Sequence, residues 1–144
     1  MIEIILIADH HRGHQQQLLA LAESLLARLN LSTASKMVSA KKNLAKKIAS
    51  RARYRMVTPF FSPSAKWPLL SPHPCYSGIT RASAAKLATI THADIIISAG
   101  HRTARTALFY KKKWGAHALH LLSPNGNGRY FDLVIRPRHE WGKG

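Results

Sequence analysis

The stretch 94-DIIISAGHRTARTALFYKKKWGAHALHLL-122 contains the pattern that decides the fold. Residues 94–98 are mostly isoleucine, which is typical of a strand buried on both faces. Residues 101–113 have the pattern of a helix, and residues 117–122 form another short, mainly apolar run. A strand, a helix and a second strand in this order predict two parallel strands joined by a right-handed crossover.

The same alternation extends outward along the chain. Residues 2–8, IEIILIA, predict a first strand, and residues 132–137, DLVIRP, predict a closing one. The remaining predicted elements are helices over 15–29, 40–54 and 81–92, a fifth strand within 31–60, and an irregular proline-rich loop at 58–75. We therefore expect one α/β domain over residues 1–144, a Rossmann-like three-layer sandwich with a mainly parallel sheet.

The charge of the chain is strongly positive. Lys and Arg number 22 against 6 Asp and Glu, which gives a net charge of +16 with histidines neutral. Such a field attracts polyanions, whether nucleic acid, anionic lipid or phosphorylated ligands. The single Cys75 cannot form an internal disulfide, and no stretch reaches the roughly 18 apolar residues of a membrane span. We expect a cytoplasmic protein that can attach peripherally to the inner face of a membrane.

Two loops follow predicted strands and carry the candidate chemistry. In parallel sheets ligands bind beyond the carboxyl ends of the strands, where 9-DHHRGH-14 and 98-SAGHRT-103 are both expected. In the first loop His14 is a candidate general base beside Asp9, and Gly13 allows a ligand to approach the backbone. The alternative is that Asp9 caps the helix and the histidines are surface residues.

The second loop has the same layout. Small residues precede basic and hydroxyl side chains at an expected helix start, so the candidate ligand-binding residues are Gly100, His101, Arg102 and Thr103. Thr103 could instead serve as a helix N-cap. Neither loop matches a dinucleotide-binding or P-loop pattern, and no Cys/His ligand set is present, so we expect no metal and no bound NAD or ATP.

A basic segment precedes the proline-rich loop. Its candidate membrane-binding or polyanion-binding residues are Lys41, Lys42, Lys46, Lys47, Arg51 and Arg53. Beside them, Phe60, Phe61 and Trp67 either enter a membrane interface or fold back on the core. The alternative for the basic segment is a solvated surface, which the lack of any acid between Glu23 and Asp94 makes less favourable.

Three motifs resemble the mitochondrial-fission Elm-type family, which is related to nucleotide-sugar glycosyltransferases of the two-Rossmann-domain (GT-B) kind. They are Asp9 with Gly13-His14 and Gln16, the segment 94–115, and the closing 131-FDLVIRPRHEW-141. Departures from the family pattern are His10 in place of a glycine and Arg105 in place of a proline.

The resemblance implies an acceptor-side, amino-terminal glycosyltransferase-like domain. It places 9-DHHRGH-14, with Asp9 and His14, on one wall of an interdomain cleft, and Gln16 is a further ligand-binding candidate of the same motif. His139 and Glu140, which follow the closing strand, should approach the same edge of the sheet. Its expected partners are an anionic lipid or a phosphorylated acceptor. A nucleotide sugar is implied only if a second domain is supplied, because the sequence stops at Gly144, as an amino-terminal fragment or a natural half. The alternative is a non-catalytic module that binds membrane, a protein partner or, with less support, nucleic acid.

Overall fold

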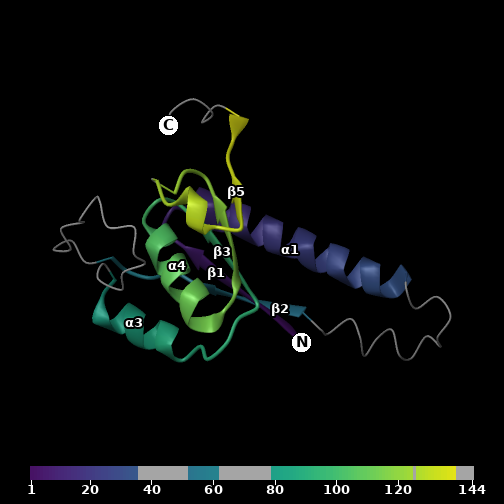
Figure 1. Cartoon of the computed structure of the whole chain (residues 1–144), viewed down its shortest axis with the longest axis horizontal. Helices are drawn as coiled ribbons and strands as arrows, with labels where there is room; N and C mark the ends of the chain where they lie inside the picture. The colour runs from purple at the N-terminus through teal and green to yellow at the C-terminus, as the bar shows by residue number, and fades with distance from the viewer. Residues whose placement is uncertain (36–51, 62–78, 125, 139–144) are drawn as a thin grey trace.

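Helices and strands alternate along the chain in a computed structural model, which describes residues 1–35, 52–61, 79–124 and 126–138. Figure 1 shows their arrangement. In chain order they are β1 (Ile2–Ala8), α1 (Arg12–Ser35), β2 (Ala52–Val57), α3 (Arg81–Ala88), β3 (Ile95–Ala99), α4 (Thr103–Trp114), β4 (His117–Leu121), the short 3-10 helix η1 (Gly128–Tyr130) and β5 (Leu133–Ile135).

The five strands form one parallel sheet in the order β2-β1-β3-β4-β5. The predicted α/β fold class and parallel sheet are thereby confirmed, as are the strands predicted near 2–8, 94–98, 117–122, 132–137 and within 31–60. β1 is an interior strand between β2 and β3, and its apolar residues are mostly buried. The expected place for a ligand is therefore beside β1.

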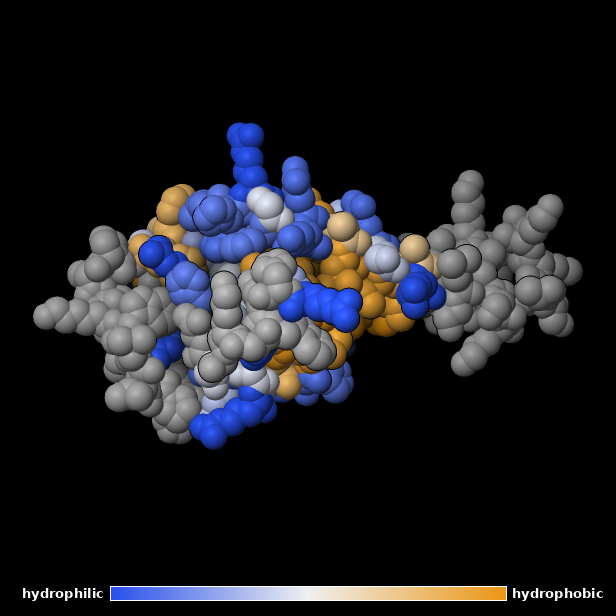
Figure 2. Space-filling view, turned by 90° about the horizontal axis from the view of Figure 1, so that it is seen from above, coloured by the Kyte–Doolittle hydropathy of each residue, from blue (hydrophilic) through white to orange (hydrophobic). Residues whose placement is uncertain are grey.

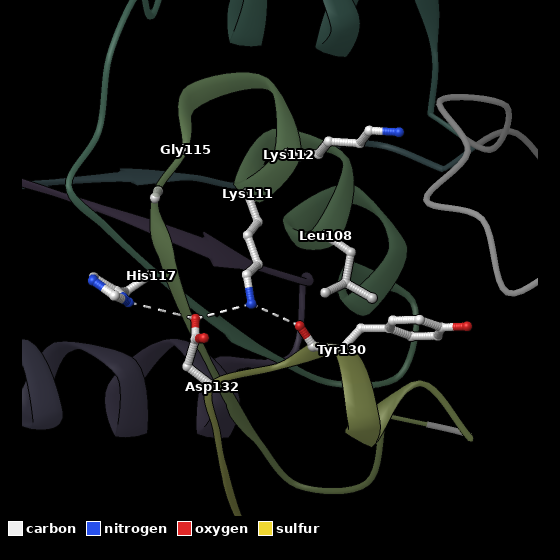
Figure 3. A pocket seen from close by; sticks show the side chains of 8 residues that line it. Leu108, Lys111, Lys112, Gly115, His117, Tyr130 and Asp132 are labelled. Atoms are coloured by element: carbon white, nitrogen blue, oxygen red, sulfur yellow. Dashed lines mark hydrogen bonds and ion pairs between the residues drawn. The ribbon is translucent and has the colours of Figure 1, made fainter.

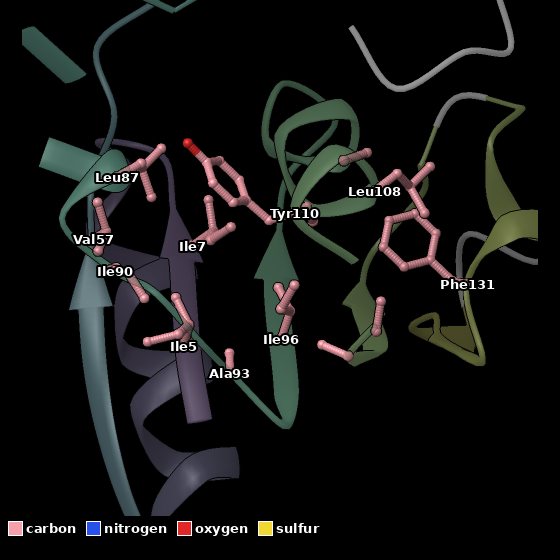
Figure 4. Packing of buried hydrophobic residues seen from close by; sticks show 14 residues of the cluster. Ile5, Ile7, Val57, Leu87, Ile90, Ala93, Ile96, Leu108, Tyr110 and Phe131 are labelled. Carbon is pink, nitrogen blue, oxygen red and sulfur yellow. The ribbon is translucent and has the colours of Figure 1, made fainter. Parts of the chain in front are cut away.

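Helices cover both faces of the sheet. On one face, Ile5 and Ile7 of β1 pack with Ile96 of β3 against α3 and α4, including the fully buried Tyr110 (Figure 4). On the other face, Ile4 and Leu6 pack against Leu18 and Ala22 of α1. Side chains alternate along a strand, so one continuous apolar run supplies both halves of the core.

The helix predicted over 40–54 is wrong where it overlaps the described residues. Ala52, Arg53 and Tyr54 belong to β2, which pairs with β1 from Ile2 to Ile7. Alternation within ARYRMV sends Tyr54 and Met56 toward the α1-side core, while Arg53 and Arg55 are exposed. Sheet pairing therefore overrides a local pattern that continues the helical spacing of the preceding lysines and alanines. The rest of that prediction lies outside the described residues.

The helix predicted over 81–92 is shorter in the structure and ends at Ala88. Thr89 forms the C-cap, and its hydroxyl donates to the carbonyl of Lys86 at 2.8 Å. Ile90 then turns into the core, where it is 4% exposed. Burial of this residue and of Ala93 leads the chain directly into β3.

The proline-rich loop predicted at 58–75 is described only at its start. Residues 58–60 form neither helix nor strand, and Phe61 forms an isolated antiparallel bridge with Ile79. Residues 62–75, including Trp67, lie outside the described part. Within the described residues no helix has the length and apolar character required to cross a membrane.

Candidate functional site

The order of the strands reverses beside β1 and creates the expected crevice. The chain leaves β1 toward β2 on one side and leaves β3 toward β4 on the other. Their following loops diverge at the carboxyl edge, which is the switch point where such sheets bind ligands. A hollow of about 440 Å³ lies there, lined by Asp9, His10, His11, Arg12, Phe61, His101 and Arg102.

Asp9 and His14 form a close pair at this edge. The Nδ1 atom of His14 lies 2.8 Å from Oδ1 and 2.9 Å from Oδ2 of Asp9. A carboxylate only accepts hydrogen bonds, so Nδ1 carries a proton and a neutral imidazole keeps its lone pair on Nε2. The His11 N–H donates to Oδ1 of Asp9, so Asp9 also fixes the turn into α1. Asp9 thus contacts both the His14 ring and the backbone just before α1.

Gly100 leaves space for the Asp9–His14 pair because it has no side chain. Its φ is +87°, and a Cβ at this position would lie 2.5 Å from Oδ2 of Asp9 and 3.1 Å from Nδ1 of His14. The loop after β3 therefore packs its backbone directly on the pair from the loop after β1. Only glycine combines this positive φ with so close an approach. The two predicted loops meet at this point.

The start of α4 presents two basic residues and buries a hydroxyl. Thr103 is fully buried, and its Oγ1 donates to the carbonyls of Ala99 at 2.8 Å and Gly100 at 2.9 Å. Thr103 thus stabilises the turn and does not line the hollow. His101 and Arg102 are exposed and line it.

Positive charge dominates the lining. Arg12 begins α1 and Arg102 precedes α4, so both helix N-termini are at this edge of the sheet. Free backbone N–H groups and the helix dipoles favour an anion there. Asp9 is the one acidic residue of the lining, and its carboxylate is paired with the His14 ring. The site is suited to a phosphate or another oxyanion.

A buried polar pair lies on the adjacent strand positions. The hydroxyl of Ser98 and Nδ1 of His120 are 2.7 Å apart, and both side chains are fully buried. The ring of His120 also packs on Phe131, with centroids 4.8 Å apart. Burial, followed by the charges of Arg136 and His14, lowers the pKa of His120 to about 4, and the backbone of Ser123 acts in the opposite direction. Sequence spacing did not identify this pair, because it depends on the register of β3 with β4.

A comparison with protein families identifies the family of this chain. The family model described as Mitochondrial fission ELM1 matches residues 12–144. The chain belongs to the mitochondrial fission ELM1 family. The family resemblance seen in the motifs is confirmed. No curated protein and no solved structure matches the chain.

The ELM1-family match includes α1, the Gly100 turn and the closing strand, and it begins after Asp9. The other predicted site residues lie as follows. Gly13 and Gln16 are exposed on α1, and a Cβ on Gly13 would meet no atom within 4 Å. The neighbouring Gln15, which the sequence analysis did not select, donates from Nε2 to the carbonyl of Asp9 at 3.0 Å.

Several predicted residues lie outside the described part of this ELM1-family chain. They are His139, Glu140, Lys41, Lys42, Lys46, Lys47 and Arg51. Arg53 is described, and it pairs with Glu3 at 3.3 Å from the exposed side of β2. No group of three metal-binding side chains is found among the described residues.

A second hollow of about 500 Å³ lies at the opposite, amino edge of the sheet, around Lys111, His117, Tyr130 and Asp132 (Figure 3). Asp132 accepts from the N–H of Ala118 at 2.7 Å and from Nζ of Lys111 at 3.0 Å. The Ala118 hydrogen bond, followed by Lys111, lowers the pKa of Asp132. These contacts attach the chain before β5 to β4 and to α4. We therefore assign this hollow a structural role in the ELM1-family chain.

Proposed function

We propose that this ELM1-family chain is a glycosyltransferase-like, acceptor-side domain whose catalytic pair is Asp9 and His14. The observation that carries the proposal is the packing of this pair against Gly100 at the switch point of the sheet. The proposal also rests on the resemblance of the family to nucleotide-sugar glycosyltransferases. The pair supplies a base, and the surrounding cations supply an anion site.

In the proposed reaction His14 acts as general base. Asp9 holds the proton on Nδ1, so Nε2 takes the proton of an acceptor hydroxyl. The acceptor oxygen then forms a bond to the anomeric carbon of the sugar, and the bond from that carbon to the nucleoside diphosphate breaks. Asp9 stabilises the imidazolium that results. This arrangement needs a donor site on a second domain, which holds the nucleotide sugar.

The acceptor in this proposal carries a phosphate. Arg12 and Arg102 approach the hollow from two different helices, and His101 adds a third nitrogen donor. Two guanidinium groups bind phosphate oxygens through several hydrogen bonds each, which a single lysine cannot do. The chain's net charge of +16 supports attachment of such an acceptor at an anionic membrane surface.

The first test concerns the base and uses a full-length member of the family. We expect His14→Ala, at the equivalent position, to lower nucleoside diphosphate release from nucleotide sugars by roughly 10²–10⁴-fold. Asp9→Asn should also lower the rate while keeping the fold. Unchanged turnover in His14→Ala contradicts the catalytic role and leaves a non-catalytic binding module.

The second test concerns the anion site and uses the chain itself. Calorimetric titration with inorganic pyrophosphate should show binding that Arg12→Ala/Arg102→Ala weakens by at least about tenfold. Lys112→Ala/Lys113→Ala is the matched control, because it removes the same charge from exposed positions near the far end of α4. If both double variants weaken binding equally, pyrophosphate binds only through the net charge of the chain.

A further inference from the structure

The hollow at the carboxyl edge of the sheet is lined mainly by flat side chains. Two of its seven described lining residues carry guanidinium groups and four carry rings, which are His10, His11, Phe61 and His101. No aliphatic side chain occurs among these described lining residues. The hollow of about 440 Å³ is within the size range of small-molecule sites. Its lining therefore favours a ligand that has a planar ring as well as an anionic group.

A second ring supports His10 on the side away from the hollow lining. The ring centroids of His10 and Phe60 are 4.4 Å apart, and the ring planes are inclined by 35°. Phe60 is not one of the described lining residues, and it is 60% exposed although it is hydrophobic. This contact restrains the His10 ring, which forms part of the wall of the hollow.

The backbone of Phe60 is fixed at the start of α3. Its N–H donates to Oγ of Ser83 at 2.7 Å, and its carbonyl accepts from the N–H of Thr80 at 2.8 Å. Thr80 is the N-cap of α3, and Ser83 is buried. These contacts hold the Phe60 ring beside His10 before any ligand binds. Such preorganisation lowers the entropic cost of binding.

The hydrophobic surface visible in Figure 2 follows a different part of the molecule. In this view from above Figure 1, it gathers in the middle and continues along the direction of α1. The hollow lies at the start of that helix, where Arg12 lines it. A hydrocarbon chain therefore has more apolar contacts along α1 than in the hollow. Nucleobases, in contrast, stack on aromatic rings and guanidinium planes, which the hollow contains.

We propose that this hollow binds a nucleotide, with its base stacked on His10 and its phosphate bound by Arg12 and Arg102. The inference rests on the anion site of the proposed function and names the molecule that carries the phosphate. This nucleotide is distinct from the donor, which the proposed function assigns to a second domain. Recognition by rings and guanidinium groups requires neither the dinucleotide-binding pattern nor the P-loop pattern, both of which the sequence lacks.

The test separates the base from the phosphate. Calorimetric titration at about 150 mM salt compares adenosine 5′-monophosphate with ribose 5-phosphate, which has the same sugar and phosphate without a base. We expect the chain to bind the nucleotide at least about tenfold more tightly, because base stacking adds to the phosphate contacts. Equal binding of the two overturns the inference and leaves the anion site of the proposed function. Failure to bind either of them or pyrophosphate removes the anion site as well.

Octyl phosphate tests the competing ligand class, because it joins a phosphate to a hydrocarbon chain. We expect the chain to bind it less tightly than adenosine 5′-monophosphate. Tighter binding of octyl phosphate overturns the proposal and assigns the hollow to a lipid phosphate.

Variants of the ring pair locate the base. His10→Ala should reduce the preference for the nucleotide over ribose 5-phosphate to less than about threefold, whereas His10→Tyr keeps a flat ring and should retain it. Phe60→Ser should weaken nucleotide binding and leave ribose 5-phosphate binding unchanged, because Phe60 acts only by positioning His10. His117→Ala is the matched control, since it removes an exposed histidine at the amino edge of the sheet.

Circular dichroism should show all of these variants folded, since His10, Phe60 and His117 are exposed. A preference that survives in His10→Ala, or that His117→Ala removes to the same extent, overturns the proposal.

A short single-stranded oligoadenylate distinguishes a free nucleotide from a nucleic-acid strand, because both present the same base and phosphate. Binding at least about tenfold tighter than that of adenosine 5′-monophosphate, with the same dependence on His10, supports the proposal and assigns the hollow to a strand. Comparable affinity supports it with a free nucleotide as the ligand. Oligoadenylate binding that His10→Ala leaves unchanged reflects only the net charge of the chain and counts against the proposal.

Discussion

The hydroxyl of Ser98 lies 2.7 Å from Nδ1 of His120 inside the sheet, one residue before each strand ends. Both residues lie on the face that α3 and α4 cover, next to Phe131. No hydrogen bond to Nε2 of His120 is found among the described residues, so protonation of this ring would bury a charge. The core is therefore built around a neutral histidine.

This neutral histidine predicts acid sensitivity. The pKa of His120 is lowered from 6.5 to about 4 in the folded chain, mainly by burial. Below pH 6.5 His120 is protonated in the unfolded chain and stays neutral in the folded chain. The free energy of unfolding therefore falls as the pH decreases toward 4. At pH 5 the expected loss is on the order of 2 kcal/mol relative to pH 7.

Urea unfolding at pH 7 and pH 5 measures this loss. His120→Gln should reduce the difference between the two pH values, because it removes the titrating group and retains a hydrogen-bonding side chain near Ser98. His101→Gln is the control, since His101 is exposed, and it should leave the difference unchanged. Equal pH dependence in the wild type and His120→Gln contradicts the assignment.

Gly100 gives a second prediction. Gly100→Ala should destabilise the chain by about 2 kcal/mol or more, because it combines the cost of a left-handed alanine with a clash against Asp9. Gly115→Ala separates the two causes. Its φ is +65° and a Cβ there would meet no atom within 4 Å, so it should cost only about 1 kcal/mol. Thermal or urea unfolding of both variants gives the comparison, and equal losses would show that the clash relaxes without cost.

Attachment to anionic membranes is the third prediction. The chain carries eight Lys and Arg in residues 36–55, and each contributes on the order of 1 kcal/mol near an anionic surface. Co-sedimentation with phosphatidylserine vesicles should be strong at low salt and weak at high salt. Lys41, Lys42, Lys46 and Lys47 replaced together by alanine should weaken it more than removal of Lys86, Lys111, Lys112 and Lys113. Similar binding to neutral vesicles would count against the electrostatic explanation.

The strands that are buried on both faces of the sheet were predictable from the sequence. IEIILIA at 2–8 and DIIIS at 94–98 are apolar without interruption, because both faces of the central strands are covered by helices. The prediction placed a strand only somewhere within 31–60 and assigned residues 52–54 of β2 to the end of a helix, because ARYRMV is an edge strand whose exposed face carries arginines. An edge strand of this kind has too few apolar residues to be distinguished from the helical pattern that precedes it.

The loops of the candidate site were predictable as a class. Polar and charged residues that directly follow parallel strands lie at the carboxyl edge of the sheet, whatever the order of the strands. Asp9 and His14 are five residues apart, so a strand followed by a helix brings them together locally. The burial of Thr103 and the exposure of Gln16 depended on how each helix rotates against the sheet.

The sequence by itself determined the alternation of strands and helices, the excess of positive charge and the two loops with candidate chemistry, because these follow from local periodicity and composition. The tertiary structure alone decided that β1 and β3 are neighbours, that Gly100 packs on Asp9, and that Ser98 meets His120. It also left Leu133 and Ile135 exposed on an apolar face. These contacts join residues far apart in the chain, and they depend on strand order and register, which the packing of the whole sheet sets.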